Sequence, residues 1–135
     1  MKKNLLPLYK RKDKYISFEN KFNNIHCHHL NIKEECAVFG ISNNKDAAAL
    51  TALGLHALQH RGQEGCGIVT YDQVNFYSER RLGLVGDNFT KEQILKKLPG
   101  SYAIGHNRYS TSGGDTIRNV QPFYADLHGG GISIA

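Results

Sequence analysis

The sequence changes character at Cys36, and this boundary limits what the chain can fold into. Residues 1–35 mix lysine, asparagine, histidine and scattered aromatic residues with no sustained period of 2 or 3.6. A stretch without hydrophobic periodicity has no apolar face to bury, so it predicts a poorly ordered leader. The pattern becomes regular from Ala37, and residues 36–135 have room for one domain with a modest core.

Short apolar runs, helical spacing and glycine-rich turns after this boundary predict an α+β fold. Asp46 is a candidate N-cap for the first helix, and Thr90 and Gln93 have the spacing of a capping box at the second. Three glycines predict a loop over residues 60–67. The expected strands are 37–41, 68–72, 74–79, 101–110 and 129–135, and the expected helices are 46–60 and 90–98. Because the last apolar strand stops at Ala135, the domain is expected to be incomplete.

The positive charge is concentrated in the leader. The chain has a formal net charge of +5, and residues 1–35 hold eight Lys/Arg against four Asp/Glu, whereas residues 36–135 hold nine against eight. This near balance argues against a surface that follows nucleic-acid phosphates. The sequence has no apolar run long enough to span a membrane and no apolar signal core, so a cytoplasmic protein without a membrane partner is expected.

Cys36 is the residue whose position most suggests chemistry. Three irregularly spaced cysteines do not form a disulfide framework, so thiols are expected. Cys36 could be a small buried apolar residue. Alternatively, cleavage of the Glu35–Cys36 bond would give it a free α-amine, whose reference pKa of about 7.7–8.0 suits a general base for the thiol. The HCHH run at residues 26–29 has no second ligand pair, so no metal site is expected.

Two arginines are candidates for holding a small polar substrate. Arg61 precedes Gly62, where a backbone can approach a ligand closely. Arg108 ends a predicted strand and is followed by the hydroxyl groups of Tyr109 and Thr111. A guanidinium binds a carboxylate through two parallel hydrogen bonds, which suits the α-carboxylate of an amino acid. The alternatives are a solvated arginine at a helix end and an exposed polar turn.

Four segments in this order resemble the amidophosphoribosyltransferase family, the glutamine phosphoribosylpyrophosphate amidotransferases that start de novo purine synthesis. They are EECAVFGI (34–41), GLHALQHRGQEGCGI (54–68), GHNRYSTSG (105–113) and NVQPF (119–123). The resemblance covers residues 34–135. Another class II glutamine amidotransferase is the second choice, although glucosamine-6-phosphate synthase typically has YRGYDSAG where this chain has HRGQEGCG.

The resemblance implies part of an N-terminal-nucleophile hydrolase fold, an αββα sandwich of antiparallel sheets. It implies a propeptide, residues 1–35, removed between Glu35 and Cys36. Cys36 would then be the catalytic nucleophile that attacks the carboxamide of glutamine. The glutamine site would include Arg108, Tyr109, Thr111, Arg61 and Gly62.

Other parts of the family pattern lie outside these residues. Residues 36–135 would be an incomplete type-2 glutamine amidotransferase domain, without the HNGN-type oxyanion segment or the phosphoribosyltransferase domain that takes phosphoribosylpyrophosphate and Mg²⁺. No cofactor is expected in this chain, an iron–sulfur cluster is left open, and a homo-oligomer is expected for the full-length protein. The chain alone is expected to be inactive as a glutaminase. A truncated, non-catalytic interaction module is the alternative from another class.

Overall fold

The computed structural model describes residues 35–109, 114 and 116–135. The chain divides into two units, Met1–Ile32 and Lys33–Ala135, and all the described residues belong to the second. The expectations for leader residues 1–34, for the HCHH run and for Thr111 therefore lie outside the described residues.

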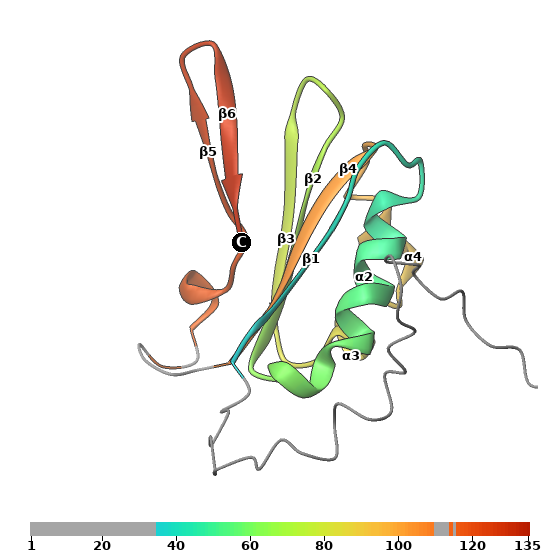
Figure 1. Ribbon diagram of the computed structural model, residues 1–135, viewed down its shortest axis with the longest axis vertical. Helices are drawn as coiled ribbons and strands as arrows, with labels where there is room; N and C mark the ends of the chain where they lie inside the picture. Colours follow the sequence, from blue (N-terminus) through green and yellow to red (C-terminus); the bar gives the residue numbers. More distant parts are fainter. Residues whose placement is uncertain (1–34, 110–113, 115) are drawn as a thin grey trace, which may run out of the picture. The chain divides into compact units, whose positions relative to one another are not determined.

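Four antiparallel strands form the main sheet, in the order β1-β4-β2-β3 (Figure 1). They are β1 (Ala37–Ile41), β4 (Tyr102–Arg108), β2 (Gly65–Tyr71) and β3 (Phe76–Leu82). A second, two-stranded antiparallel sheet is a hairpin of β5 (Phe123–Leu127) and β6 (Gly130–Ile134). The predicted α+β class with antiparallel sheets is confirmed.

Helix α2 (Ala47–Ala57) covers one face of the main sheet, and small residues allow the close contact. A Cβ on Gly54 would lie 2.6 Å from the Phe39 ring, and one on Gly105 would lie 2.6 Å from Leu55. The buried core is mostly apolar and forms between this helix, the sheet and the segment after β3; its members are Ala47, Ala48, Ala52, Leu55, Cys66, Ile68, Val85, Phe89, Leu98 and Ala103. Cys66 is completely buried in this core.

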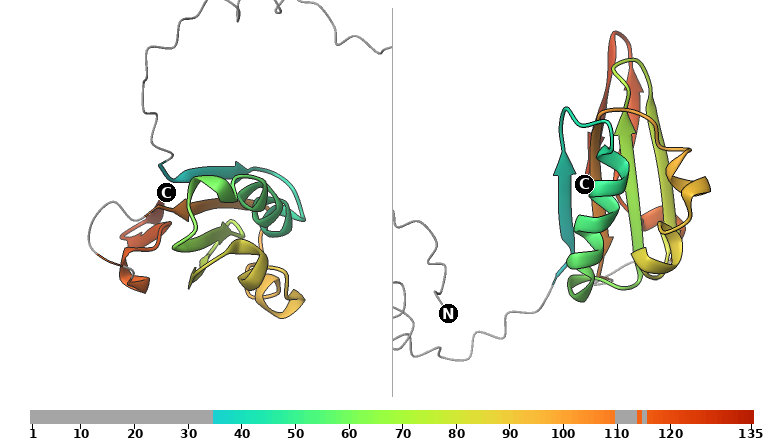
Figure 2. Two further views of the ribbon diagram at one scale, coloured as in Figure 1. Left: turned by 90° about the horizontal axis from the view of Figure 1, so that it is seen from below. Right: turned by 90° about the vertical axis from the view of Figure 1, so that its right-hand side faces the viewer.

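The hairpin β5–β6 lies on the sheet face opposite α2 (Figures 1 and 2). Successive side chains of a strand point to opposite faces, so Gly65 and Gly67 face away from the core that contains Cys66 and Ile68. A Cβ on Gly67 would lie 2.3 Å from the carbonyl oxygen of Gln121, just before β5. The order helix, sheet, sheet corresponds to three layers of the expected αββα sandwich.

Several sequence-based boundaries need correction. The predicted loop 60–67 is wrong in its second half, because β2 begins at Gly65 and its glycines serve close packing rather than a turn. The second helix, α4 (Glu92–Leu95), is shorter than predicted. Its N-cap is Lys91, and the Thr90 hydroxyl instead donates a hydrogen bond to the Gly86 carbonyl at 2.9 Å. The missed elements are β5, α3 (Val85–Asn88), η1 (Gln59–Arg61) and η2 (Ile117–Asn119).

The first helix and the hairpins follow the prediction more closely. Asp46 occupies the N-cap position of α2, although within the described residues its side chain makes no capping hydrogen bond. The side chain of Asn44 instead accepts a hydrogen bond from the Asp46 backbone N–H at 2.8 Å. Strands β2 and β3 pair as the predicted hairpin, and β3 extends three residues beyond the predicted end at Glu79.

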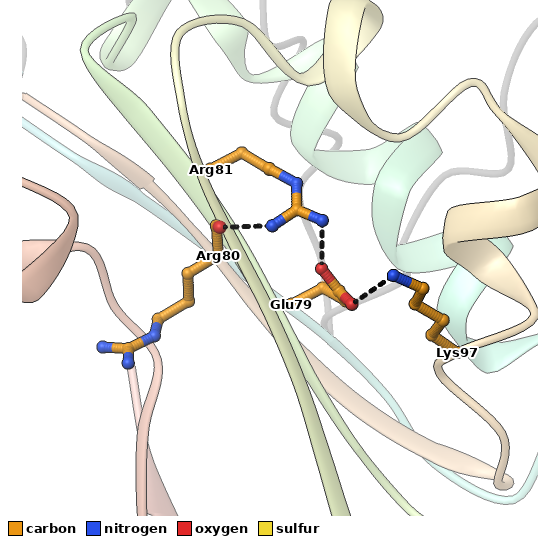
Figure 3. A network of polar contacts seen from close by, with 4 residues as sticks. All are labelled: Glu79, Arg80, Arg81 and Lys97. Atoms are coloured by element: carbon orange, nitrogen blue, oxygen red, sulfur yellow. Dashed lines mark hydrogen bonds and ion pairs between the residues drawn. The ribbon is translucent and has the colours of Figure 1, made fainter.

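A charged network lies on the α2 side of the edge strand β3 (Figure 3). The mostly buried carboxylate of Glu79 pairs with Arg81 at 2.5 Å and with Lys97 at 3.6 Å. Arg81 also donates a hydrogen bond to the Arg80 carbonyl at 3.1 Å. The network ties β3 to Lys97 in the segment after residue 95.

Candidate active site

Pairing of β1 with β4 brings Cys36 to the strand end that carries Arg108 and Tyr109. Ala37 lies opposite Asn107, so the residues just outside this pair also meet. The Tyr109 backbone N–H donates a hydrogen bond to Cys36 Sγ at 3.4 Å, and the thiol lies 3.8 Å from the Tyr109 carbonyl oxygen. Two segments separated by 73 residues in sequence thus hold the half-buried thiol in place.

The backbone at Cys36 is unusual for a residue with a side chain. Its φ is 35°, in the left-handed region that glycine tolerates but that costs other residues conformational energy. Such strain persists where the surrounding structure over-determines it and is common at functional sites. The contacts of Cys36 with Tyr109 and with Arg61 supply that constraint.

Arg61 donates hydrogen bonds to the backbone carbonyls of two consecutive residues, Glu35 and Cys36. Its Nε donates to the Cys36 carbonyl at 2.9 Å, and its Nη2 donates to the Glu35 carbonyl at 3.0 Å. The structure therefore places Arg61, one of the residues expected in the glutamine site, beside the cysteine. Its guanidinium hydrogen-bonds backbone carbonyls in this structure, rather than pointing into solvent as the alternative of a helix-terminal arginine would require.

Gln59 holds the short segment that carries Arg61, and sequence reasoning missed it. Its Nε2 donates to the Gly62 carbonyl at 2.6 Å, while its Oε1 accepts from the Val85 N–H at 2.7 Å. The side chain thus ties η1 to the start of α3. The sequence feature that could have indicated Gln59 is its position as a polar residue between an apolar helix and the Arg61-Gly62 pair.

The backbone at Gly62 lies so close to the backbone of Arg108 and Tyr109 that a side chain would not fit. A Cβ at this position would lie 2.6 Å from the Arg108 carbonyl carbon and 2.9 Å from the Tyr109 nitrogen. The Glu64 N–H also donates to the Arg108 carbonyl at 3.3 Å. The predicted loop residue Gly62 therefore packs directly on the end of β4.

Arg108 lies at the same sheet end as Cys36, and its side chain contacts the η2 segment. Its Nη1 donates to the Asn119 carbonyl in η2 at 2.9 Å, and the residue is half-buried. The neighbouring Asn107 points to the α2 face, where it donates to the Leu55 carbonyl at 2.7 Å. His106 is buried on the strand, and burial, with a smaller contribution from Arg108, lowers its pKa.

The structure thus gathers Glu35, Cys36, Arg61, Gly62 and Tyr109 in direct contact and places Arg108 beside them. Thr111 lies outside the described residues. Within the described part of the chain, His, Cys, Asp and Glu form no group of three that could hold a metal ion. A hollow of about 220 Å³ lies at the opposite end of the sheet, where Tyr71 pairs with Tyr102, so it is separate from the cysteine site.

Known proteins that are similar in sequence to this chain include amidophosphoribosyltransferases. An amidophosphoribosyltransferase of Rhizobium etli is 62% identical over 104 residues, which are 77% of this chain and 21% of that protein. Amidophosphoribosyltransferase 3 of Arabidopsis thaliana, a chloroplastic protein, is 52% identical over 104 residues, covering 77% of this chain and 19% of that protein. Over these residues the chain is similar to amidophosphoribosyltransferases. It spans about a fifth of the length of these relatives.

Two solved structures share the fold. One, described as the allosteric regulatory enzyme of purine biosynthesis, matches with a TM-score of 0.65 and 41% identity over 71% of this chain and 21% of its own. The other, glutamine phosphoribosylpyrophosphate amidotransferase from B. subtilis complexed with ADP and GMP, matches with a TM-score of 0.64 and 40% identity over 73% of this chain and 21% of its own. No family model matches the chain. The resemblance drawn from the four motifs and the N-terminal-nucleophile fold are confirmed, in preference to another class II amidotransferase. None of the helices in the described part of the chain is long and apolar enough to cross a membrane.

Proposed function

We propose that this chain carries the nucleophile and part of the glutamine site of an amidophosphoribosyltransferase. The observation that carries the proposal is the position of Cys36 Sγ, 3.4 Å from the Tyr109 N–H at the strand end that holds Arg108. Removal of residues 1–35 gives Cys36 a free α-amine at that place. The similarity to amidophosphoribosyltransferases suggests the reaction, release of ammonia from glutamine.

In this reaction the Cys36 thiol attacks the carboxamide carbon of glutamine, and the α-amine of Cys36 takes up the thiol proton. The amine then returns the proton to the leaving nitrogen, which departs as ammonia and leaves a γ-glutamyl thioester on the sulfur. Water attacks the thioester, releases glutamate and restores the thiol. The Tyr109 N–H donates a hydrogen bond to the sulfur and so helps to hold it at the strand end beside Arg108.

Arg108 is the group proposed to hold the α-carboxylate of glutamine, together with Tyr109 and Thr111. Its half-buried guanidinium is braced by the Asn119 carbonyl, so part of its orientation is fixed before substrate arrives. Arg61 and Gly62 are proposed to line the same site near the sulfur. A fixed guanidinium binds a planar carboxylate better than a flexible ammonium does.

For the complete protein we propose that the ammonia replaces the pyrophosphate of phosphoribosylpyrophosphate to give phosphoribosylamine. That step belongs to a phosphoribosyltransferase part that would use Mg²⁺, and the described residues provide no metal cluster of their own. For this protein we propose a homo-oligomeric, cytoplasmic enzyme. The plant relatives, by contrast, are chloroplastic. The 135-residue chain alone is proposed to lack glutaminase activity, because the oxyanion segment lies outside it.

The proposal is tested with the protein expressed from its complete reading frame. Cys36→Ala should abolish phosphoribosylamine formation with glutamine and preserve it with ammonium, because only the glutaminase step needs the thiol. Cys66→Ala is the matched control: Cys66 is completely buried in the core, so this variant should retain the glutamine reaction. Glutamine-dependent activity in the Cys36→Ala protein would disprove the assigned role.

A further inference from the structure

Arg61 contacts the carbonyl of the one peptide bond that the sequence predicts is cleaved. Its Nη2 lies 3.0 Å from the oxygen of Glu35, whose carbonyl carbon is bonded to the Cys36 nitrogen. Its Nε lies 2.9 Å from the Cys36 carbonyl oxygen, which fixes the guanidinium plane beside the same backbone. A permanent cation therefore hydrogen-bonds the carbonyl oxygen on which negative charge would develop if that bond were attacked.

We propose that Arg61 is a catalytic residue for removal of the leader: it polarises the Glu35 carbonyl so that the thiol of Cys36 can cleave its own preceding peptide bond. This task is separate from lining the glutamine site. The inference rests on the proposed function only in taking Cys36 as the nucleophile.

The step balances within this chain plus one water molecule. Cys36 Sγ forms a bond to the Glu35 carbonyl carbon, and the oxyanion on Glu35 is stabilised by the Arg61 Nη2–H. The bond between that carbon and the Cys36 nitrogen then breaks, and the thiol proton ends on this nitrogen as the new α-amine. Water hydrolyses the resulting thioester, which gives a Glu35 carboxylate and restores the Cys36 thiol. No redox partner or metal ion is involved.

The backbone conformation of Cys36 favours this reaction. Its φ of 35° lies in the left-handed region, and this torsion includes the carbon of Glu35. Once the bond is cut, the torsion no longer exists and its strain is released. The intact bond is thus held in a strained state by the contacts that also position the thiol, namely those to Tyr109 and Arg61.

The guanidinium is also held firmly enough to act as a preorganised donor. Gln59 ties the η1 segment to α3 through bonds of 2.6 Å to the Gly62 carbonyl and 2.7 Å from the Val85 N–H. Gly62 in turn packs against the Arg108 backbone with no room for a Cβ. A donor fixed before the reaction stabilises a developing oxyanion without reorganisation.

The test follows cleavage of the complete protein synthesised from purified translation components that contain no protease. Intact mass spectrometry measures the fraction that begins at Cys36 as a function of time. Arg61→Ala should slow cleavage by about 10²–10³-fold, the effect of losing one oxyanion donor. Millimolar guanidinium chloride should restore part of the rate to Arg61→Ala. Arg61→Lys should be slower than the natural protein, because an ammonium cannot contact both carbonyls in a fixed plane.

Arg81→Ala is the matched control, since it removes the same charge from a residue whose contacts are with Glu79 and the Arg80 carbonyl. It should be cleaved at the natural rate, and Cys36→Ala should stay intact. Melting temperatures of Arg61→Ala and Arg81→Ala are measured in the uncleaved Cys36→Ala background. Similar melting temperatures would show that slow cleavage of Arg61→Ala comes from loss of the hydrogen-bond donor and not from unfolding. Cleavage of Arg61→Ala at the natural rate would overturn the inference, as would a natural precursor that stays intact until a protease-containing extract is added.

The proposed function is tested separately, with protein expressed from a start codon placed directly before Cys36. Active protein from this gene together with normal cleavage of Arg61→Ala refutes only the processing role. Inactive protein from this gene, together with cleavage that depends on Arg61, refutes the glutaminase assignment and leaves the processing role standing.

Discussion

Replacing Gly62 with alanine should displace the segment that carries Arg61 and impair the glutamine reaction. The added Cβ would lie 2.6 Å from the Arg108 carbonyl carbon, 2.7 Å from its oxygen and 2.9 Å from the Tyr109 nitrogen. These are backbone atoms of a central strand, so the glycine side must move. Ordinary contact begins at 3.4 Å, which requires a shift of about 0.8 Å (3.4 minus 2.6).

A shift of this size is large enough to break the hydrogen bonds that Arg61 makes. Carried to Arg61, it would lengthen the hydrogen bonds of 2.9 Å and 3.0 Å to as much as about 3.7 and 3.8 Å, beyond bonding range. Gly62 has an extended φ of −171°, so the substitution adds no left-handed strain and its cost is steric. Overpacking of this kind costs about 1–3 kcal/mol of unfolding free energy. Misplacement of catalytic groups by about 1 Å reduces kcat/KM by roughly 10²-fold.

The assay compares the glutamine-dependent and ammonium-dependent rates of protein produced with Cys36 as its first residue after the start methionine. Gly62→Ala should lose about 10²-fold in glutamine kcat/KM, keep its ammonium rate and unfold at a lower urea concentration. Gly86→Ala is the control, because its Cβ would meet His56 at an ordinary 3.5 Å. Natural stability and natural glutamine kcat/KM for Gly62→Ala would refute the steric reasoning.

Two further predictions concern titration and thiol reactivity. Burial, with a smaller contribution from Arg108, lowers the pKa of His106 in the folded protein, so the unfolded chain binds the proton more readily. The free energy of unfolding should therefore fall as pH drops through about 6.5, the unfolded value, and His106→Gln should flatten this slope in urea titrations between pH 5 and 7.5; an unchanged slope would contradict the assignment. Burial also raises the pKa of the Cys66 thiol to about 12. At pH 8 iodoacetamide should alkylate Cys36 while Cys66 stays unmodified in the folded protein, and peptide mapping that finds Cys66 labelled equally fast would contradict its burial.

The strands that the sequence predicts well are those whose pattern is local. Residues 37–41 form a short apolar run between polar segments, and β1 has these bounds. Residues 74–79 follow a turn after another apolar run, so the β2–β3 hairpin is also predicted. By contrast, Gly65 and Gly67 indicated a loop because glycine is usual in turns. In the structure, the missing side chains of these glycines allow Val120 and Gln121 to pack against the sheet. The contact joins segments more than 50 residues apart, so a local sequence pattern cannot predict it.

Sequence reasoning named candidate site residues but not the contacts that they make. Cys36, Arg61 and Arg108 were named from their types and from the family motifs, and they do gather at one end of the sheet. The attachment of Arg61 to the carbonyls of Glu35 and Cys36 depends on β1 passing beside η1, which only the folded chain decides. The same holds for Gln59, whose Oε1 accepts a hydrogen bond from the N–H of Val85, 26 residues away in sequence.

The central claim is that Cys36 is an N-terminal nucleophile, and mass spectrometry of the reacting protein tests it most directly. The protein from the complete reading frame is mixed with glutamine, quenched in acid within a turnover and digested. We expect a γ-glutamyl thioester on Cys36, in a peptide that begins at Cys36 with a free α-amine, and its loss in hydroxylamine. A γ-glutamyl group on another residue, or an active protein whose peptide still carries Glu35 before Cys36, would contradict the account.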